Sequence, residues 1–269
     1  MDNKQVNIFK KQQKFYPSKK MGQNFLVDNS AINKIIDNVP NLYDYDLILE
    51  IGPGLGAITD SLVKTQKPVI AIELDKRLFE QINKKFSVYN NFKVINNDVL
   101  QVDFDELLNK YKNVIVIANL PYSITTPIVI KCLKQQKISS LYIMVQKEVG
   151  DKWDYKIKSN RNASTNILNS FYNIKKCFDI KNTSFNPVPK VDSSMMLLTR
   201  KNNSVYDEKF YSFLKTIFLA KRKKLLNNFS NIADKQKMVN ILKELSINLN
   251  IRAEELQYED LFQIYKLWS

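Results

Sequence analysis

Residues 47–56 read LILEIGPGLG, a short apolar run that leads directly into a glycine turn. The chain holds only five glycines, and three of them are Gly52, Gly54 and Gly56. Glycine lets the backbone approach a ligand closely, and a helix after the turn would offer free N–H groups at its N-terminus. The G-x-G-x-G spacing is about one residue shorter than the dinucleotide fingerprint. The stretch therefore predicts a strand, a turn and a helix that together contact a ligand.

Further apolar runs follow this stretch and alternate with helix-like segments. Such alternation predicts a parallel sheet covered on both faces, and hence an α/β fold. Helical apolar spacing also precedes the stretch and ends at Pro40. The predicted further strands lie at 68–72, 92–95, 114–118 and 141–145, the predicted preceding helix at 29–39, and a predicted edge strand at 195–198.

Three parts are expected along the chain. Residues 1–20 carry six Lys and one Asp and predict a basic arm. Residues 21–200 hold the predicted strands and form the expected catalytic domain. From Tyr206 the apolar spacing is helical, so residues 201–269 are expected to form a helical C-terminal domain that binds RNA.

Acidic side chains stand where two of the predicted strands end. Glu73 follows Gly52 by 21 residues, and an acid at this place can accept hydrogen bonds from both hydroxyls of a ribose. Asp98 follows the next strand and can accept from an adenine amino group. Parallel strands bring these residues to one carboxyl-end crevice, where open α/β sheets bind ligands. The ligand is expected to carry an adenosine, and these residues leave its other half open.

The motif Asn119-Leu120-Pro121-Tyr122 follows the predicted strand at 114–118. An adenine amino nitrogen is a poor nucleophile because its lone pair is delocalised into the ring. The Asn119 oxygen and a nearby backbone carbonyl can accept both N–H bonds, which favours a pyramidal nitrogen facing a methyl donor. Pro121 stiffens the turn, and Tyr122 offers a face on which an extruded base can stack. The motif predicts methyl transfer to adenine.

The composition excludes several other chemistries. The sequence has no His, which excludes a Ser-His-Asp triad and His-ligated metals, and no metal is expected. Cys132 and Cys177 form no CxxC pair, which fits a reducing compartment and argues against a zinc site. No apolar run of about 18 residues and no secretory signal are found, so a cytoplasmic protein without a membrane partner is expected.

The charge predicts a polyanionic partner. Lys and Arg number 41 against 27 Asp and Glu, a net charge of +14. Such an excess favours nucleic acid over the alternative that a chain rich in Lys, Asn and Ile only reflects a biased genome composition. The charge is uneven, with a compact cluster at 221–224 on a segment expected to be helical. The residues predicted to contact RNA are Lys19, Lys20, Lys190, Lys221, Arg222, Lys223 and Lys224.

Taken together, the motifs of the chain resemble those of the KsgA family, which dimethylates two adjacent adenosines near the 3′ end of small-subunit ribosomal RNA. The resemblance runs from about Lys19 to the end and is carried by motifs that recur in the family's order. They are GQNFL at 22–26, EIGPGLG at 50–56, NLPY at 119–122, QKE at 146–148, PVPKVDS at 187–193 and RAE at 252–254.

The resemblance implies a Rossmann-like, seven-stranded methyltransferase domain with a small helical C-terminal domain. It implies S-adenosylmethionine as cofactor and ribosomal RNA within the small ribosomal subunit as partner. The protein is expected to be a monomer. It also suggests that Phe185 stacks on the target adenine opposite Tyr122, so that Phe185 joins residues 119–122 as a catalytic candidate. The implied cofactor contacts are Asn24, Leu26, Gly52, Gly54, Glu73, Leu74, Asp98, Val99 and Asn119.

One segment departs from the family's pattern. Residues 159–164 read SNRNAS where the family usually has a glycine-containing stretch. Cofactor chemistry is expected to survive this change, whereas an RNA-facing loop is expected to differ.

Three alternatives share part of this pattern. Erm-type enzymes, which methylate large-subunit RNA, are similar in fold and in the NLPY loop. Their glycine turn usually has Lys and His after the second Gly, and their later motif has Asn where Asp192 stands. DNA adenine methyltransferases normally add a larger recognition region than the last 70 residues provide. A non-catalytic role, as in related mitochondrial transcription factors, would be marked by a degraded catalytic loop, whereas this one is intact. Binding during subunit assembly is compatible with catalysis.

Overall fold

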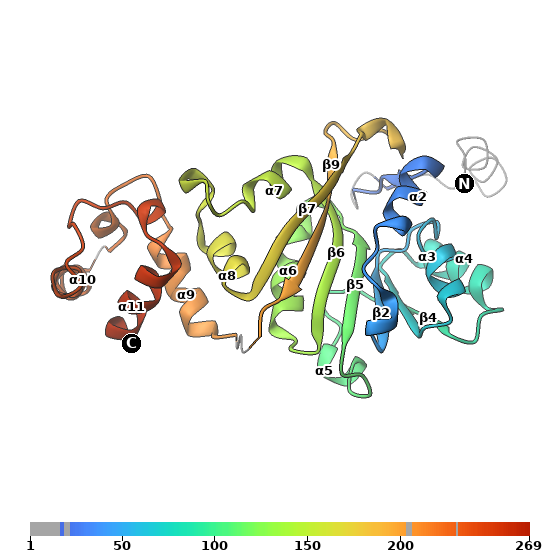
Figure 1. Ribbon diagram of the computed structural model, residues 1–269, viewed down its shortest axis with the longest axis horizontal. Coiled ribbons are helices and arrows are strands. Elements are labelled where there is room, and N and C mark those ends of the chain that lie inside the picture. Colours follow the sequence, from blue (N-terminus) through green and yellow to red (C-terminus); the bar gives the residue numbers. More distant parts are fainter. Residues whose placement is uncertain (1–16, 19–21, 203–205, 230) are drawn as a thin grey trace. The chain divides into compact units, whose positions relative to one another are not determined.

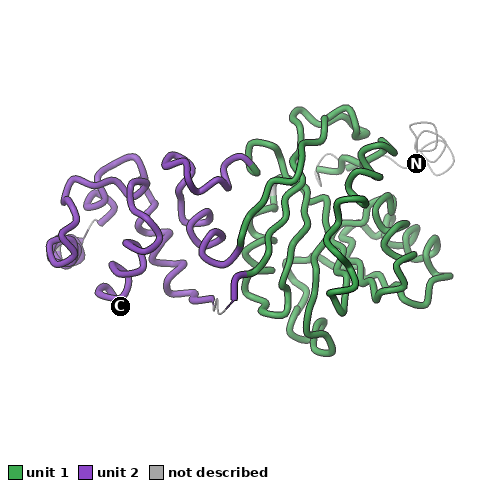
Figure 2. Tube along the Cα trace, in the orientation of Figure 1, with its two compact units in different colours: residues 1–150, 173–200 green, residues 151–172, 201–269 purple. Residues whose placement is uncertain are grey.

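The computed structural model of the protein describes residues 17–18, 22–202, 206–229 and 231–269, and Figure 1 shows its elements. The described residues form two compact units, coloured separately in Figure 2. Unit 1 holds the residues up to 150 together with 173–200. Unit 2 holds residues 151–172 and the residues from 201 onward.

Unit 1 is built on a seven-stranded sheet of order β4-β3-β2-β5-β6-β9-β7. The five strands from β4 to β6 are parallel, and β9 runs antiparallel to β6 with Gln146 opposite Ser193. The expected seven-stranded α/β fold is therefore confirmed. The strands are β2 (Leu47–Ile51), β3 (Val69–Glu73), β4 (Phe92–Asn96), β5 (Val114–Asn119), β6 (Ile138–Gln146), β7 (Tyr172–Ile180) and β9 (Ser193–Arg200).

The central strands are buried along their length because their residues, apart from Glu50 and Glu73, are mostly apolar on both faces. Every residue of β2 and β3 is buried, as expected for a parallel sheet with both faces covered. A second, small sheet pairs β1 (Phe25–Leu26) with β8 (Phe185–Asn186) in antiparallel register, Leu26 opposite Phe185. This pairing places the start of the described chain against a segment about 160 residues later.

Three helices of unit 1 begin at aspartates whose carboxylates accept free N–H groups of the first turn. Asp28 caps α2 (Asn29–Asp37), Asp75 caps α4 (Lys76–Phe86) and Asp103 caps α5 (Phe104–Leu107). The other helices near this sheet are α3 (Thr59–Leu62), α6 (Thr125–Lys134) and α7 (Lys147–Lys152), and the 3-10 turns are η1 (Leu42–Asp44), η2 (Val63–Thr65), η3 (Tyr122–Ile124) and η5 (Asn182–Ser184).

The prediction of an edge strand at 195–198 is wrong. β9 lies inside the sheet, between β6 and β7. Met195, Met196 and Leu198 are all buried, and a run of consecutive apolar residues is typical of an interior strand. The edge on this side of the sheet is β7, whose Lys175 and Lys176 are exposed. Lysine on an edge strand discourages pairing with another chain.

Unit 2 is helical, and aromatic residues form much of its interior. The Tyr265 ring lies 5.0 Å from that of Phe210 and 5.5 Å from that of Phe213, and Trp268 lies 5.1 Å from Phe229 (centroid distances). The predicted helical character after Tyr206 is confirmed. Its helices are α8 (Ala163–Phe171), α9 (Glu208–Ile217), α10 (Ile232–Glu244) and α11 (Tyr258–Trp268), with 3-10 turns η4 (Lys158–Asn160), η6 (Leu225–Asn228) and η7 (Ala253–Glu255).

Residues 151–172, which the sequence assigns to the catalytic domain, belong to unit 2 instead. Arg161 explains the difference. Its side chain is buried, and Nη1 donates to the carbonyls of Glu254, Glu255 and Leu256 at 3.3–3.4 Å. A buried guanidinium needs acceptors such as carbonyls around it, so this bond set fixes the unusual segment 159–164 to the 3-10 turn at Ala253–Glu255 and the residue after it.

Candidate active site

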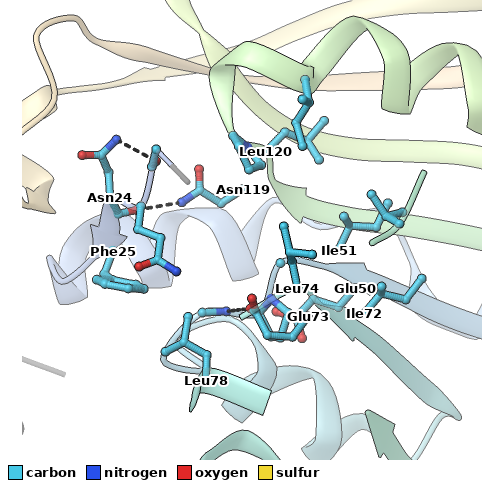
Figure 3. A pocket seen from close by; sticks show the side chains of 18 of the residues that line it. Asn24, Phe25, Glu50, Ile51, Ile72, Glu73, Leu74, Leu78, Asn119 and Leu120 are labelled. Carbon is cyan, nitrogen blue, oxygen red and sulfur yellow. Dashed lines mark hydrogen bonds between the residues drawn. The ribbon is translucent and has the colours of Figure 1, made fainter. Parts of the chain in front are cut away.

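A cavity lies in unit 1 at the carboxyl ends of β2, β3, β4 and β5 (Figure 3). This is the edge at which open α/β sheets bind ligands. Its wall contains every residue predicted to bind the cofactor: Asn24, Leu26, Gly52, Gly54, Glu73, Leu74, Asp98, Val99 and Asn119. The four residues of the NLPY motif line the same cavity. The structure therefore brings together residues that span almost a hundred positions of sequence.

The glycine turn has a conformation that other residues rarely adopt. Gly54 and Gly56 have φ angles of +59° and +78°. A Cβ at Gly54 would lie 3.2 Å from the Phe25 ring, and one at Gly56 would lie 2.7 Å from the Phe86 ring. The two glycines thus allow Phe25 to pack on the turn and α4 to pack beneath it.

Glu73 connects the turn to the end of β3. Its Oε2 accepts the N–H of Gly54 at 3.2 Å (Figure 3). Its Oε1 accepts the N–H of Asp75 at 2.9 Å. Burial raises the pKa of Glu73, and the two backbone donors oppose that rise. The carboxylate is held rigidly, and each oxygen keeps a second lone pair for a ligand hydroxyl.

Glu50 is a second buried acid in the cavity wall, to which the sequence reading assigned no role. Thr59 Oγ1 donates to Glu50 Oε2 at 2.7 Å. Burial raises the pKa of Glu50 to about 7, and the nearby charge of Glu73 contributes to the rise. An acid inside the otherwise apolar run at 47–51 was the signal that could have identified it.

Apolar side chains flank the acids. Leu74 is 50% exposed although it lines the cavity, whereas Val99 is buried. Asp98 Oδ1 accepts the N–H of Leu100 at 2.9 Å, which orients the carboxylate and leaves its second oxygen available as an acceptor. The cavity wall therefore combines an exposed apolar side chain with an oriented carboxylate acceptor.

The NLPY loop follows β5 and is fixed from two sides. Leu120 N–H donates to the Met144 carbonyl at 3.2 Å, and the Asn119 Nδ2 donates to the Asn24 carbonyl at 3.4 Å. Figure 3 shows the bond between Asn119 and Asn24 as a dashed line. Because the amide nitrogen faces Asn24, the Asn119 oxygen is directed elsewhere and remains an acceptor.

Tyr122 lines the cavity, and its hydroxyl hydrogen-bonds Ser193 Oγ at 2.8 Å. Burial raises the pKa of Tyr122, so the phenol stays neutral. Phe185 does not line the cavity. Its side chain is 2% exposed and packs in the core with Leu26 and Met195, so its stacking role stays a prediction that requires the ring to turn outward.

The predicted RNA contacts are spread over both units. Lys19 and Lys20 lie outside the described residues. Lys190 is exposed between β8 and β9. In unit 2, Lys221 Nζ donates to the Ser159 carbonyl, and Arg222, Lys223 and Lys224 are exposed.

The expectation that residues 221–224 are helical is wrong, because α9 ends at Ile217 and the cluster lies in a turn. The side-chain amide of Asn228 bonds the Ile217 carbonyl and the Ala220 N–H, which satisfies backbone groups that a longer helix would use. Leu225 N–H then donates to the Ile251 carbonyl at 2.8 Å. The turn presents three exposed cations together.

Across the described residues, no group of three or more Cys, Asp or Glu side chains converges as a metal site would require. None of the helices in the described ranges is long and apolar enough to cross a membrane.

Comparison with known proteins agrees with this geometry. The ribosomal RNA small subunit methyltransferase A of Ureaplasma parvum serovar 3 is 43% identical over 264 residues, which cover 95% of each chain. A crystal structure of a dimethyladenosine transferase from Plasmodium falciparum superposes with a TM-score of 0.76 at 25% identity, covering 89% of this chain and 95% of that one. The 23S rRNA methyltransferase ErmE shares the fold, with a TM-score of 0.64 at 22% identity, covering 91% and 99%. Since the family match extends over residues 15–269, this chain belongs to the ribosomal RNA adenine dimethylase family.

Proposed function

We propose that this protein transfers methyl groups from S-adenosylmethionine to the N6 amines of two adjacent adenosines near the 3′ end of small-subunit ribosomal RNA. The observation that carries the proposal is the cavity in which the glycine turn, Glu73, Asp98 and the NLPY loop meet. Family membership supports the reaction class, and the name of the Ureaplasma relative supports the small subunit as the substrate.

The cavity residues fit the proposed cofactor. Glu73 would accept from the ribose hydroxyls, Asp98 from the adenine amine, and Leu74 would be covered by the adenine ring, which accounts for an exposed leucine in a cavity wall. The glycine turn leaves room for the chain that joins ribose to sulfur. When bound, S-adenosylmethionine supplies an electrophilic methyl group on a sulfonium.

Asn119 and Tyr122 would act on the target base. The Asn119 oxygen accepts one N–H of the adenine amine and directs its lone pair toward the methyl group. Once methylated, the amine nitrogen would be cationic and acidic and would release its proton to solvent. No strong base is needed, which agrees with a sequence that has no His. Tyr122 offers a neutral aromatic face to the extruded base.

The basic residues would hold the RNA by its phosphates. Arg222, Lys223 and Lys224 are exposed together in one turn, and Lys190 is exposed in unit 1. Such contacts give affinity without reading sequence. We propose that they orient the ribosomal RNA while the cavity selects an adenine.

The test is methylation of small subunits that lack the modification. Purified protein and S-adenosylmethionine are incubated with small subunits or with large-subunit RNA, and the RNA is digested and measured by mass spectrometry. Dimethyladenosine confined to the small-subunit sample is the expected result. Modification of the large-subunit RNA alone would instead favour an Erm-type activity and overturn the substrate assignment.

A further inference from the structure

Residues 22–26, here called the strap, line the cavity together with the glycine turn. The strap is held at its C-terminal end, where Phe25 and Leu26 form β1 and pair with β8. The Phe25 ring also packs with Leu55 and Leu78. These contacts fix the second half of the strap but leave its first half, residues 22–24, to other interactions.

Gln23 fixes that first half through both ends of its amide. Its Nε2 donates to Asp75 Oδ2 at 3.0 Å, and its Oε1 accepts the N–H of Ser18 at 2.7 Å. The Gln23 N–H in turn donates to the Ser18 carbonyl at 3.3 Å. A single side chain therefore joins the strap to the segment before it and to the N-terminus of α4.

Asp75 is a strong acceptor for this bond. Its side chain is 4% exposed, and Arg77 donates to both of its oxygens, at 3.0 and 2.6 Å. The Arg77 guanidinium lowers the pKa of Asp75 to about 2, and the bond from Gln23 contributes. The carboxylate thus stays ionised, and an amide N–H donated to an ionised carboxylate is stronger than one donated to a neutral group.

The next residue, Asn24, contacts the NLPY loop. Its carbonyl accepts the Asn119 Nδ2 at 3.4 Å, and this contact sets which way the Asn119 oxygen points. Movement of Gln23 would displace the neighbouring carbonyl. The chain of contacts runs from Asp75 through Gln23 and Asn24 to Asn119.

We propose that Gln23 is a positioning residue for methyl transfer: by anchoring the strap to Asp75, it holds the Asn24 carbonyl where it orients the Asn119 amide. This inference rests on the proposed function. It assigns to Gln23 a role separate from cofactor contact, because its polar atoms are engaged by Asp75 and Ser18. Loss of the anchor loosens the strap, so turnover falls even when cofactor and RNA are saturating.

The test exchanges donor and acceptor across the bond in the full-length protein. Gln23→Glu removes the donor and sets two carboxylates against each other. Asp75→Asn sets two amide donors against each other. Combining Gln23→Glu with Asp75→Asn restores one donor and one acceptor between the two side chains, and the new amide keeps an oxygen to cap α4. The Arg77 Nη2 loses its acceptor on residue 75 in both variants that carry Asp75→Asn, so the combined variant is compared with each single variant. Gln236→Ala, which removes an exposed amide pair with Asn240 in α10, is the matched control.

The measurements are kcat at saturating S-adenosylmethionine and small subunit, the Kd for S-adenosylmethionine by calorimetry, and the melting temperature. Each single variant is expected to lower kcat about tenfold and to raise the Kd severalfold. The combined variant is expected to have a kcat about fivefold above that of either single variant, and Gln236→Ala is expected to match the wild type. A global loss of stability would not be repaired by the second substitution.

Two results would overturn the inference: wild-type kcat and Kd in Gln23→Glu, or single-variant losses that the combination does not repair. Failure of the proposed function gives a different signature. Wild-type protein would then bind S-adenosylmethionine without methylating small subunits, and the pattern of Kd values across the four variants would still show whether Gln23 anchors the strap.

Discussion

Thr59 Oγ1 donates to Glu50 Oε2 at 2.7 Å, and both side chains are buried where β2 leads into the glycine turn and α3. The bond joins the first residue of α3 to the strand before the turn, so it closes the turn from beneath. A carboxyl in such a place is stable mainly in its neutral form, because burial penalises the charge.

Exchanging Glu50 for glutamine should therefore change how stability depends on pH. The pKa of Glu50 is about 7 in the folded protein and near 4.5 when unfolded. A raised pKa gives stability that is present below the unfolded value and lost as the pH rises through 7. The free energy of unfolding of Glu50→Gln, measured relative to that of the wild type, should therefore rise by about 1 to 3 kcal/mol between pH 5 and pH 8. Urea unfolding at both pH values measures this. Glu80→Gln, at an exposed site in α4, should show no such gain. If the unfolding free energies of the two variants changed equally with pH, the raised pKa of Glu50 would be contradicted.

Changing the two acids at the strand ends should weaken cofactor binding and leave RNA binding intact. Glu73→Gln keeps one acceptor oxygen but cannot receive both ribose hydroxyls. Asp98→Asn places an amide donor opposite the adenine amine. Each should raise the Kd for S-adenosylmethionine by an amount worth about 1 to 2 kcal/mol. Titration calorimetry gives the values, with the exposed Asp37→Asn as the control. Unchanged affinity in both variants would remove these acids from the site.

Removing the side chain of Asn119 should abolish most of the methyl transfer. Asn119→Ala loses the oxygen that accepts from the target amine, and kcat is expected to fall about 100- to 1,000-fold. It also loses the bond to the Asn24 carbonyl, so cofactor affinity should fall slightly. Single-turnover methylation with saturating cofactor separates the two effects. Near wild-type single-turnover rates would refute the role assigned to the amide.

Neutralising the exposed cluster in unit 2 should weaken RNA binding and its dependence on salt. Each phosphate contact contributes a log–log slope of about −0.7 to −0.9. Lys221 is engaged by the Ser159 carbonyl, so substitution of Arg222, Lys223 and Lys224 by Ser should carry most of the effect. Filter binding at several salt concentrations gives the slopes, and the calorimetric Kd for cofactor should not change. A control variant with the exposed Lys84, Lys110 and Lys112 replaced by Ser loses the same charge. If the two triple variants gave the same slope of log affinity against log salt concentration, the cluster would contact no phosphate.

The sequence predicted those features that depend on neighbours along the chain. The apolar runs gave the strands of the parallel sheet, and residue type at their ends gave Glu73, Asp98 and Asn119, because parallel strands bring their carboxyl ends to one edge. The fold class followed from the same alternation.

Features that depend on distant contacts were missed. The place of β9 inside the sheet depends on β7, and the end of α9 depends on Asn228, eleven residues beyond Ile217. The assignment of residues 151–172 to unit 2 depends on a bond from Arg161 to carbonyls more than ninety residues later. Gln23 belongs to the GQNFL motif, but its anchoring contact could not be predicted because Asp75 lies 52 residues later in the chain.

The pairing of Leu26 with Phe185 also means that the small sheet can form only late during synthesis of the chain. A ribosome delivers Leu26 early, yet its strand partner emerges only after the parallel core of the sheet has been synthesised. Contacts between such distant residues close late, because a long loop must first be brought together. A nascent chain that ends before β8 therefore carries the glycine turn and both acids without the completed small sheet above them. The strand β8, which pairs with the cavity-lining strand β1, is therefore translated after all the residues that line the cavity.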